Sequence, residues 1–206
     1  MPIDPGSQRR NSSSTLARWI FPALVWALAP HEAGAETYVV DLSHSSVDFS
    51  IRHLVSRTTG HFNEFRGTIT YDPASPEAST FSGVIEAKSI DTGNERRDNH
   101  LRSADFFEVG KYPRIEFAST SVKKGKEDLL EVTGTLSLHG VTKPVTFPVE
   151  VLGVGVHPMN GRAVAGFAAE LTVKRSDYGV DSWADAAGVL GDEVKITVLI
   201  EALGGE

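Results

Sequence analysis

Regular alternation of apolar and polar residues is the feature that most constrains the fold of this 206-residue chain. Between Leu130 and Leu138 every second residue is apolar or glycine, and the same pattern returns between Val145 and Val151. Successive side chains of a β-strand point to opposite faces, so each run builds a strand with one apolar and one largely polar face. Similar runs recur through most of the chain, which predicts an all-β protein.

Turn residues such as Asp72-Pro73, His139-Gly140 and Asn160-Gly161 divide this pattern into a short first strand, Tyr38–Asp41, and several long ones. The long strands are expected at Val47–Val55, Phe62–Tyr71, Phe81–Ile90, Arg114–Val122, Leu129–Leu138, Thr142–Leu152, Arg162–Lys174 and Glu193–Ala202. Asn-Gly is a favoured hairpin turn, so the strands on either side of it should pair antiparallel. Eight antiparallel strands favour a closed barrel, because closure removes exposed strand edges.

A short helical insert interrupts the strands after the third long run. Thr92 and Glu95 have the spacing of a capping box, and helix-tolerant residues follow them. A short, polar helix has little stability of its own. We therefore expect Leu101, Phe106 and Phe107 to hold it against the barrel.

Small residues recur on the predicted inner face of the barrel. Gly83, Gly134, Ala165 and Ala169 are examples. An eight-stranded barrel either fills its interior with side chains or holds one small ligand. Because small residues leave space, we favour a hollow apolar interior over the alternative of a packed core.

The first 35 residues have the features of a secretory signal peptide. Three arginines precede the apolar run 19–29, and Ala33-Gly34-Ala35 offers a small-residue cleavage site before Glu36. A membrane-spanning helix needs about 20 apolar residues, which this run lacks, although an N-terminal anchor is the alternative. The sequence thus predicts a signal peptide over 1–35, a barrel domain over 36–206, and a periplasmic or secreted protein.

The charge of the chain disfavours several classes of partner. Removal of residues 1–35 takes away three of 20 basic and two of 27 acidic residues, which leaves a net charge of −8. Nucleic-acid binding rests on excess Lys and Arg, so no nucleic acid is expected as a partner. Wide contact with anionic lipid surfaces is disfavoured for the same reason.

Patterns typical of catalysis or metal binding are weak. The chain has no cysteine and no Gly-x-Ser-x-Gly nucleophile motif. Its histidines, including His44, His139 and His157, lack a familiar metal-ligand spacing. We therefore predict no catalytic residue, no metal site, no cofactor and no enzyme activity.

Several short sequence motifs occur in the same order as in a known protein family. They are Val47-Asp-Phe-Ser-Ile-Arg-His53, Gly60-His-Phe-Asn-Glu-Phe-Arg-Gly67, Arg97-Asp-Asn-His-Leu-Arg-Ser103, Tyr112-Pro-Arg-Ile-Glu-Phe117, Gly134-Thr-Leu-Ser-Leu-His-Gly-Val-Thr-Lys-Pro-Val145, Arg175-Ser-Asp-Tyr-Gly179 and Gly191-Asp-Glu-Val-Lys-Ile196. With them the chain resembles the YceI-like family of polyisoprenoid-binding periplasmic proteins. The resemblance implies an extended, lipocalin-like barrel that holds a long isoprenoid lipid. That lipid would be an isoprenoid quinone, its precursor or a polyprenyl phosphate, carried rather than transformed.

Two other functions stay open at this point. One is a hydrolase-type enzyme that acts on a small apolar ligand in the barrel, and the other is a stress-related structural or interaction protein with a filled barrel. Transient membrane contact and a homodimer also stay open.

Apolar residues on the inner faces of the predicted strands and beside the insert are the lipid-binding candidates, although any of them could instead pack the core. With one histidine they are Val47, Phe49, Ile51, His53, Phe62, Phe65, Ile69, Phe81, Ile85, Phe107, Ile115, Phe117, Leu136, Leu138, Phe147, Val149 and Phe167. Phe62 and Phe65 share a face of one strand only if a bulge intervenes, near Asn63.

Polar residues that could contact a lipid head group are fewer. His53 lies on an apolar track, where a buried imidazole needs hydrogen-bond partners. Asn99, His100 and Arg102 of the helical insert are candidates at the barrel mouth, with a solvated helix as the alternative. Lys174-Arg175 is a candidate pyrophosphate site, but an exposed basic pair is ordinarily solvated.

Overall fold

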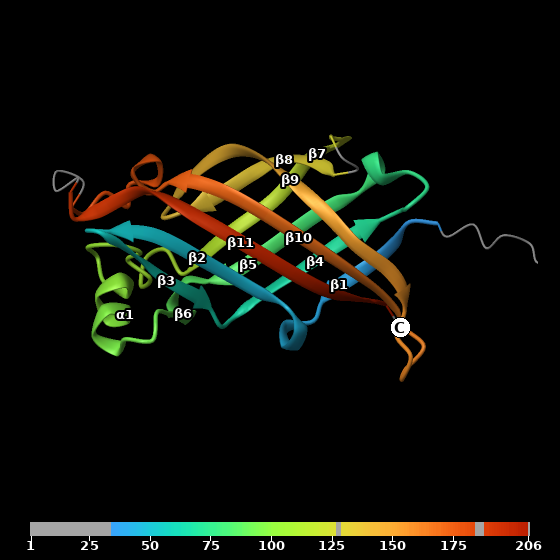
Figure 1. Ribbon diagram of the computed structural model, residues 1–206, viewed down its shortest axis with the longest axis horizontal. Helices are drawn as coiled ribbons and strands as arrows, with labels where there is room; N and C mark the ends of the chain where they lie inside the picture. Colours follow the sequence, from blue (N-terminus) through green and yellow to red (C-terminus); the bar gives the residue numbers. More distant parts are fainter. Residues whose placement is uncertain (1–33, 127–128, 184–187, 206) are drawn as a thin grey trace, which may run out of the picture. The chain divides into compact units, whose positions relative to one another are not determined.

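The protein is a closed eight-stranded antiparallel β-barrel with one α-helix in the part of the chain that the structure describes (Figure 1). The computed structural model describes residues 34–126, 129–183 and 188–205. The predicted fold class is therefore confirmed. The predicted signal peptide lies outside the described residues except for Gly34 and Ala35. Among the described helices, none is long and apolar enough to cross a membrane.

Eleven strands of the described residues form a single sheet. They are β1 Glu36–Val40, β2 Ser46–His53, β3 Ser56–Phe62, β4 Phe65–Tyr71, β5 Thr80–Glu86, β6 Ile90–Asp91, β7 Arg114–Lys124, β8 Leu130–Leu138, β9 Val141–Val156, β10 Ala163–Lys174 and β11 Leu190–Gly204. The barrel wall runs in the order β1-β4-β5-β7-β8-β9-β10-β11 and closes where β11 pairs with β1.

Strand β11 is long enough to pair with two different strands along the same edge. Its last residues pair with β1, and its earlier part, up to Leu199, pairs with β2. The short 3-10 helix η1, Leu42–His44, separates β1 from β2. β3 then pairs with β2 and β6, while β4 pairs with β1 and β5. Two strands therefore share each of three wall positions, β1 with β2, β4 with β3 and β5 with β6, which explains how eleven strands make an eight-stranded barrel.

The predicted strand Phe62–Tyr71 is wrong in one respect, because the chain breaks within it. β3 ends at Phe62 and β4 begins at Phe65, so both rings reach the barrel interior without a bulge inside one strand. β3 itself was not predicted, because the residues before Phe62 are polar or glycine and show no apolar alternation. The predicted end of the preceding strand, Val55, instead lies in a turn beside Leu54, whose φ is 51°.

The predicted helical insert forms α1, Glu95–Arg102. The N-cap is Asn94, whose side chain accepts a hydrogen bond from Arg97 N, so the predicted capping box at Thr92 is wrong. The Thr92 hydroxyl instead donates to the Asp98 carboxylate. Leu101, Phe106 and Phe107 line the barrel interior, which confirms that they hold the insert in place. A polar helix without an apolar face needs such anchors.

The barrel core consists of two clusters, which we call the packed end and the hollow end. The packed end contains buried Tyr38, Ile69, Tyr71, Val122, Leu130, Val132, Val149, Ala165, Phe167 and Ala202. The hollow end contains buried Val47, Phe62, Ala87, Ile90, Ile115, Leu136, Val173 and Tyr178, with many further apolar side chains that are only partly buried. Leu101 of α1 packs against the hollow end.

Candidate functional site

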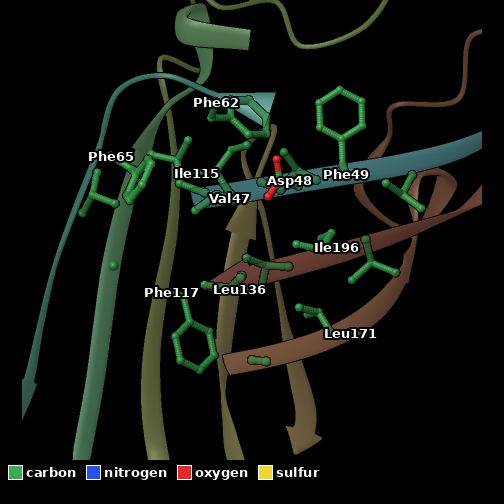
Figure 2. Close-up of a pocket in the computed structure, with 18 of the residues that line it drawn as sticks. Val47, Asp48, Phe49, Phe62, Phe65, Ile115, Phe117, Leu136, Leu171 and Ile196 are labelled. Atoms are coloured by element: carbon green, nitrogen blue, oxygen red, sulfur yellow. The ribbon is translucent and has the colours of Figure 1, made fainter. Parts of the chain in front are cut away.

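A cavity of about 300 Å³ occupies the interior of the barrel. Side chains from most of the wall strands and from the α1 segment surround it, and nearly all of them are aliphatic or aromatic (Figure 2). The polar exceptions in its wall are Asp48, Arg66, Ser82 and Arg175. This volume lies at the lower end of the range of ligand pockets, and an apolar lining with few polar groups is typical of them.

Every predicted lipid-binding residue except His53 lies in the cavity wall. The residues placed there are Val47, Phe49, Ile51, Phe62, Phe65, Ile69, Phe81, Ile85, Phe107, Ile115, Phe117, Leu136, Leu138, Phe147, Val149 and Phe167. Strand alternation brings them together, because closure of the sheet turns one face of every strand inward. Their contact with a ligand stays a prediction.

Aromatic rings from different strands meet around the cavity. The ring centroids of Phe49 and Phe62 are 5.8 Å apart, those of Phe62 and Phe107 are 6.2 Å apart, and those of Phe117 and Phe147 are 5.3 Å apart. Phe49 is nevertheless only partly buried, although it faces the interior. We attribute this remaining exposure to the cavity, which one side of the ring faces.

Two inner-face glycines have different consequences for the cavity. Gly83 pairs with Gly67 across β4 and β5, and a Cβ added at Gly83 would meet only Arg66 O, at 3.8 Å. At Gly134 an added Cβ would lie 2.6 Å from the Phe117 ring and 2.4 Å from Ala118 O. Gly83 therefore leaves open space in the wall, as predicted, whereas Gly134 makes room for Phe117.

His53 is not a buried cavity residue, and the prediction that placed it on an inner track is wrong. The side chain is exposed at the last position of β2 and lies outside the cavity wall. Ile51 is the last β2 residue in that wall. The strand alternates to its end, but beyond Ile51 it has left the barrel interior.

The head-group candidates of the insert also lie outside the cavity wall. Arg102 Nε donates to Lys88 O at 2.7 Å and Nη2 donates to Ile90 O at 2.6 Å. Its Nη1 donates to Asn99 Oδ1 at 3.2 Å, and His100 Nε2 lies 2.9 Å from Asp105 Oδ2. Arg102 thus ties α1 to the backbone before β6 and within it.

Arg175 is a polar residue of the cavity wall, and its environment differs from the one predicted. The side chain is 5% exposed, so the expectation of an exposed basic pair is wrong for this member. Its Nε donates to Gly191 O at 2.9 Å, and Nη1 donates to Val180 O and Ser182 O, both at 2.7 Å. Burial lowers the pKa of this guanidinium, and the carboxylates of Asp192 and Asp181 oppose that shift. Arg175 continues the alternation of inward-facing residues in β10, two positions after Val173. This alternation is the sequence signal that could have predicted its burial.

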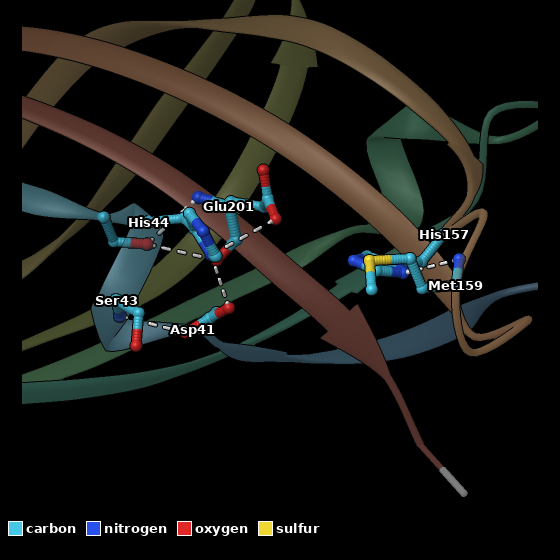
Figure 3. A network of polar contacts seen from close by, with 7 residues as sticks. Asp41, Ser43, His44, His157, Met159 and Glu201 are labelled. Carbon is cyan, nitrogen blue, oxygen red and sulfur yellow. Dashed lines mark hydrogen bonds and ion pairs between the residues drawn. The ribbon is translucent and has the colours of Figure 1, made fainter.

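A second polar cluster lies where η1 meets β11 (Figure 3). His44 Nδ1 is 2.8 Å from Asp41 Oδ2 and 3.7 Å from Glu201 Oε1. The hydrogen bond between the two side chains raises the pKa of His44 and lowers that of Asp41. These three side chains have a composition that could ligate a metal ion, and they lie outside the cavity wall. In the structure they tie η1 to the last strand.

A model of the YceI-like domain matches residues 38–202. The chain belongs to the YceI-like family. Protein YceI of Escherichia coli is 41% identical over 174 residues, which cover 83% of this chain and 88% of that protein. The crystal structure of BcnA from Burkholderia cenocepacia has 28% sequence identity and a TM-score of 0.73, and the match covers 79% of this chain and 99% of BcnA.

A polyisoprenoid binding domain from Saccharophagus degradans has the same fold. Its structure superposes with a TM-score of 0.63 and 18% sequence identity, over 84% of this chain and 100% of that domain. At this identity the likeness shows the fold alone.

Proposed function

We propose that this protein binds a long-chain isoprenoid lipid in the barrel and carries it without chemical change. The observation that carries the proposal is the cavity inside the barrel, whose wall is almost entirely aliphatic and aromatic. The family membership supports it, as does the description of the Saccharophagus degradans domain as polyisoprenoid binding. Isoprenoid quinones, their precursors and polyprenyl phosphates all have a tail of this kind.

The affinity would come mainly from the tail. Each buried CH₂ contributes about 0.8 kcal/mol, so ten tail carbons supply on the order of 8 kcal/mol before any cost. Immobilisation of a flexible chain consumes a large part of this. Affinity should therefore increase with tail length until the cavity is full, while polar groups at its edge select the head group.

The wall favours binding over catalysis. No histidine lies in the cavity wall as far as the structure describes it. Its buried cation, Arg175, donates to backbone carbonyl oxygens and does not activate a nucleophile. General acid–base chemistry needs a group that exchanges protons near neutral pH, and a guanidinium does not.

Export is part of the proposal. Residues 1–35 have the composition of a signal peptide, and a periplasmic carrier would be cut before Glu36. Intact-mass measurement of the protein from a periplasmic fraction should give a chain that begins at Glu36. A full-length mass in the membrane fraction would favour an N-terminal anchor.

Mass spectrometry on protein purified without detergent tests the ligand directly. We expect a stoichiometric apolar adduct under native conditions, which organic extraction identifies as a prenylated species. A variant that fills the cavity, Gly83→Leu, should lose the adduct, because its side chain would enter open space. The control is Gly153→Leu, at an exposed glycine with free space around it and outside the cavity wall.

An adduct-free mass would contradict the proposal if added prenylquinones also left Trp183 fluorescence unchanged. The filled-barrel interpretation would then replace the carrier. Turnover of apolar esters or amides by the purified protein would instead favour the hydrolase alternative.

A further inference from the structure

The turn between β2 and β3 and the segment before β11 expose large apolar side chains at the hollow end of the barrel. We call these residues, Leu54, Val55 and Trp183, the apolar tip. Leu54 is 50% exposed and Trp183 is 54% exposed, and the side chain of Val55 is fully exposed. Single exposed apolar residues are normal on a soluble protein, whereas a group of them at one place marks an interaction surface.

Hydrogen bonds hold the two segments of the apolar tip at the same end of the barrel (Figure 1). Leu54 N donates to Val189 O at 2.8 Å, which joins the turn after β2 to the residues before β11. Arg175 donates to Gly191 O and also to Ser182 O, the carbonyl that directly precedes the tryptophan of the tip. The three apolar side chains therefore project from neighbouring parts of the surface.

Two residues of the apolar tip have a backbone conformation that disfavours large side chains. The φ angle is 51° at Leu54 and 64° at Trp183. Glycine and asparagine adopt this left-handed region at lower cost, and bulky residues are rare in it. Such residues concentrate at functional sites. Because both side chains are half exposed, packing of the barrel does not explain why these positions carry leucine and tryptophan.

Positive charge flanks the apolar tip. Arg52 and Arg57 lie directly opposite each other across β2 and β3, and both are exposed. Like charges at opposite positions of an antiparallel pair destabilise it. Arg57 donates to the uncharged Ser50, through Oγ at 2.6 Å and O at 2.8 Å, so these contacts do not neutralise its charge. An anionic partner would relieve the repulsion between the two arginines.

Carboxylates of the neighbouring segments oppose contact with an anionic partner, but each has a cation beside it. Asp181 and Asp192 partly offset the lowering of the pKa of Arg175, which burial causes. Glu193 lies opposite Lys174 across β10 and β11. The turn between the two arginines, residues 53–56, contains no acidic residue. The excess of positive charge therefore lies at the turn that carries two of the three apolar side chains.

Apolar, aromatic and cationic side chains in this combination fit the surface of an anionic bilayer. Tryptophan is enriched at the boundary between head groups and acyl chains, and aliphatic side chains are buried there. Arginines beside them are attracted to anionic lipids. The chain as a whole has a net charge of −7, which disfavours contact with such a bilayer through most of its surface. The local charge therefore favours contact through this end.

From this arrangement we propose that the apolar tip inserts into the surface of an anionic bilayer, with Arg52 and Arg57 against the lipid phosphates. Ile51 and Leu190, which line the cavity, lie next to the tip in the chain or in the sheet. Docking in this orientation would bring the hollow end to the membrane. Its use for loading and release of a lipid rests on the proposed carrier function, whereas the docking itself does not depend on the cargo.

Sedimentation with vesicles measures the docking. The protein, purified without detergent, is mixed with phosphatidylcholine vesicles that contain either no phosphatidylglycerol or about one third of it. The partition coefficient should be at least about tenfold higher for the anionic vesicles. Added NaCl should narrow this difference, because salt screens the arginine charges. Equal partition into both kinds of vesicle would overturn the proposal.

A pair of double variants tests the apolar contribution. Leu54→Ser combined with Val55→Ser should lower partition into anionic vesicles by at least about tenfold, because the inserted side chains are lost. The matched control combines Val154→Ser with Val156→Ser, which removes two exposed valines of β9 at the packed end. This control should partition like the natural chain. Circular dichroism checks that both variants are folded.

Two further changes test the charges and the depth of insertion. Arg52→Glu combined with Arg57→Glu should abolish the preference for anionic vesicles, whereas Lys123→Glu combined with Lys124→Glu, at exposed positions of β7, should leave it unchanged. Brominated phospholipids quench tryptophan at the membrane interface. They should quench a component of the fluorescence that Trp183→Phe lacks.

The outcomes separate this proposal from the carrier function. Vesicle binding that survives the change of Leu54 and Val55 to serine overturns the docking site. A natural chain that is dimeric and stays off vesicles, with a monomeric serine variant, overturns it too and assigns the tip to a second copy. Neither residue lines the cavity, so the serine variant should retain the prenyl adduct in native mass spectrometry. Absence of that adduct from the natural chain overturns the carrier and leaves the docking intact.

Discussion

The packed end and the hollow end of the barrel use the same strand alternation but fill their interiors differently. At the packed end the Phe167 ring lies 5.5 Å from Tyr71 and 5.6 Å from Phe81, in edge-to-face contacts. Burial raises the pKa of the Tyr71 hydroxyl there, as expected for a desolvated phenol. At the hollow end, inner-track side chains such as Leu171 and Ile196 stay partly exposed.

This difference teaches that an apolar inner track specifies a closed barrel but not what occupies it. Occupancy depends on whether side chains from opposite walls reach one another. Large rings meet at the packed end, whereas at Gly83 and Gly67 no side chain projects from either of two paired positions. Space inside a barrel is therefore decided by a few positions on the inner face of the sheet.

The largest expected effect is the loss of a ring at the packed end. Phe167→Ala should lower the free energy of unfolding by about 3–5 kcal/mol, because it removes a buried ring and leaves a cavity. Phe49→Ala at the hollow end should cost about half as much, since that ring is only partly buried, whereas Phe167 is 3% exposed. Urea unfolding of both variants measures the difference, and equal losses would contradict the distinction between the two ends.

Tail length is the next test of the hollow end. Prenyl alcohols of increasing length should bind more tightly by roughly a factor of ten or more for each added isoprene unit, because each unit buries several carbons. Calorimetric titration of a C10, C15 and C20 series measures this. A flat dependence on length would mean that the tail does not enter the cavity.

Substitution of the inner-face glycines Gly134 and Gly83 by alanine tests, with a smaller change in side-chain volume, whether the barrel interior is filled at each position. Gly134→Ala should destabilise the fold by about 1–3 kcal/mol, because its Cβ would press on Ala118 O and the Phe117 ring. Gly83→Ala should cost less than about 0.5 kcal/mol, since its Cβ has space. Thermal unfolding of the pair checks this, and a costly Gly83→Ala would mean that the wall is already filled there.

The smallest effect concerns the cluster of Asp41, His44 and Glu201. The pKa of His44 is raised by its hydrogen bond to Asp41, so its contribution to stability is present below the ordinary histidine pKa of about 6.5. That contribution is lost as the pH rises through the higher folded-state pKa of His44. The melting temperature of the natural chain should therefore exceed that of His44→Gln at pH 5.5, and the gap should shrink by pH 8.5. A gap that widens with pH would contradict the ion pair.

The sequence predicted the barrel and the apolar cavity wall because period-two alternation alone determines which side chains a closed sheet turns inward. It could not show where a strand leaves the barrel, and His53 was misplaced for that reason. It also could not show that the carbonyl groups of Val180, Ser182 and Gly191 surround the Arg175 guanidinium, because these contacts join separate segments. β3 was missed because its pairing with β2 and β6, rather than an apolar pattern, makes it a strand.

The pairing of β1 with the end of β11 has a consequence for how the molecule is made. Tyr38 lies opposite Gly204, so β1 gains its second neighbour only after β11 has been synthesised. Loop closure over such a separation is entropically costly, and folds with many distant contacts form slowly. A nascent chain that still lacks β11 cannot complete the ring, so the strands made earlier have to form their other contacts before the barrel closes.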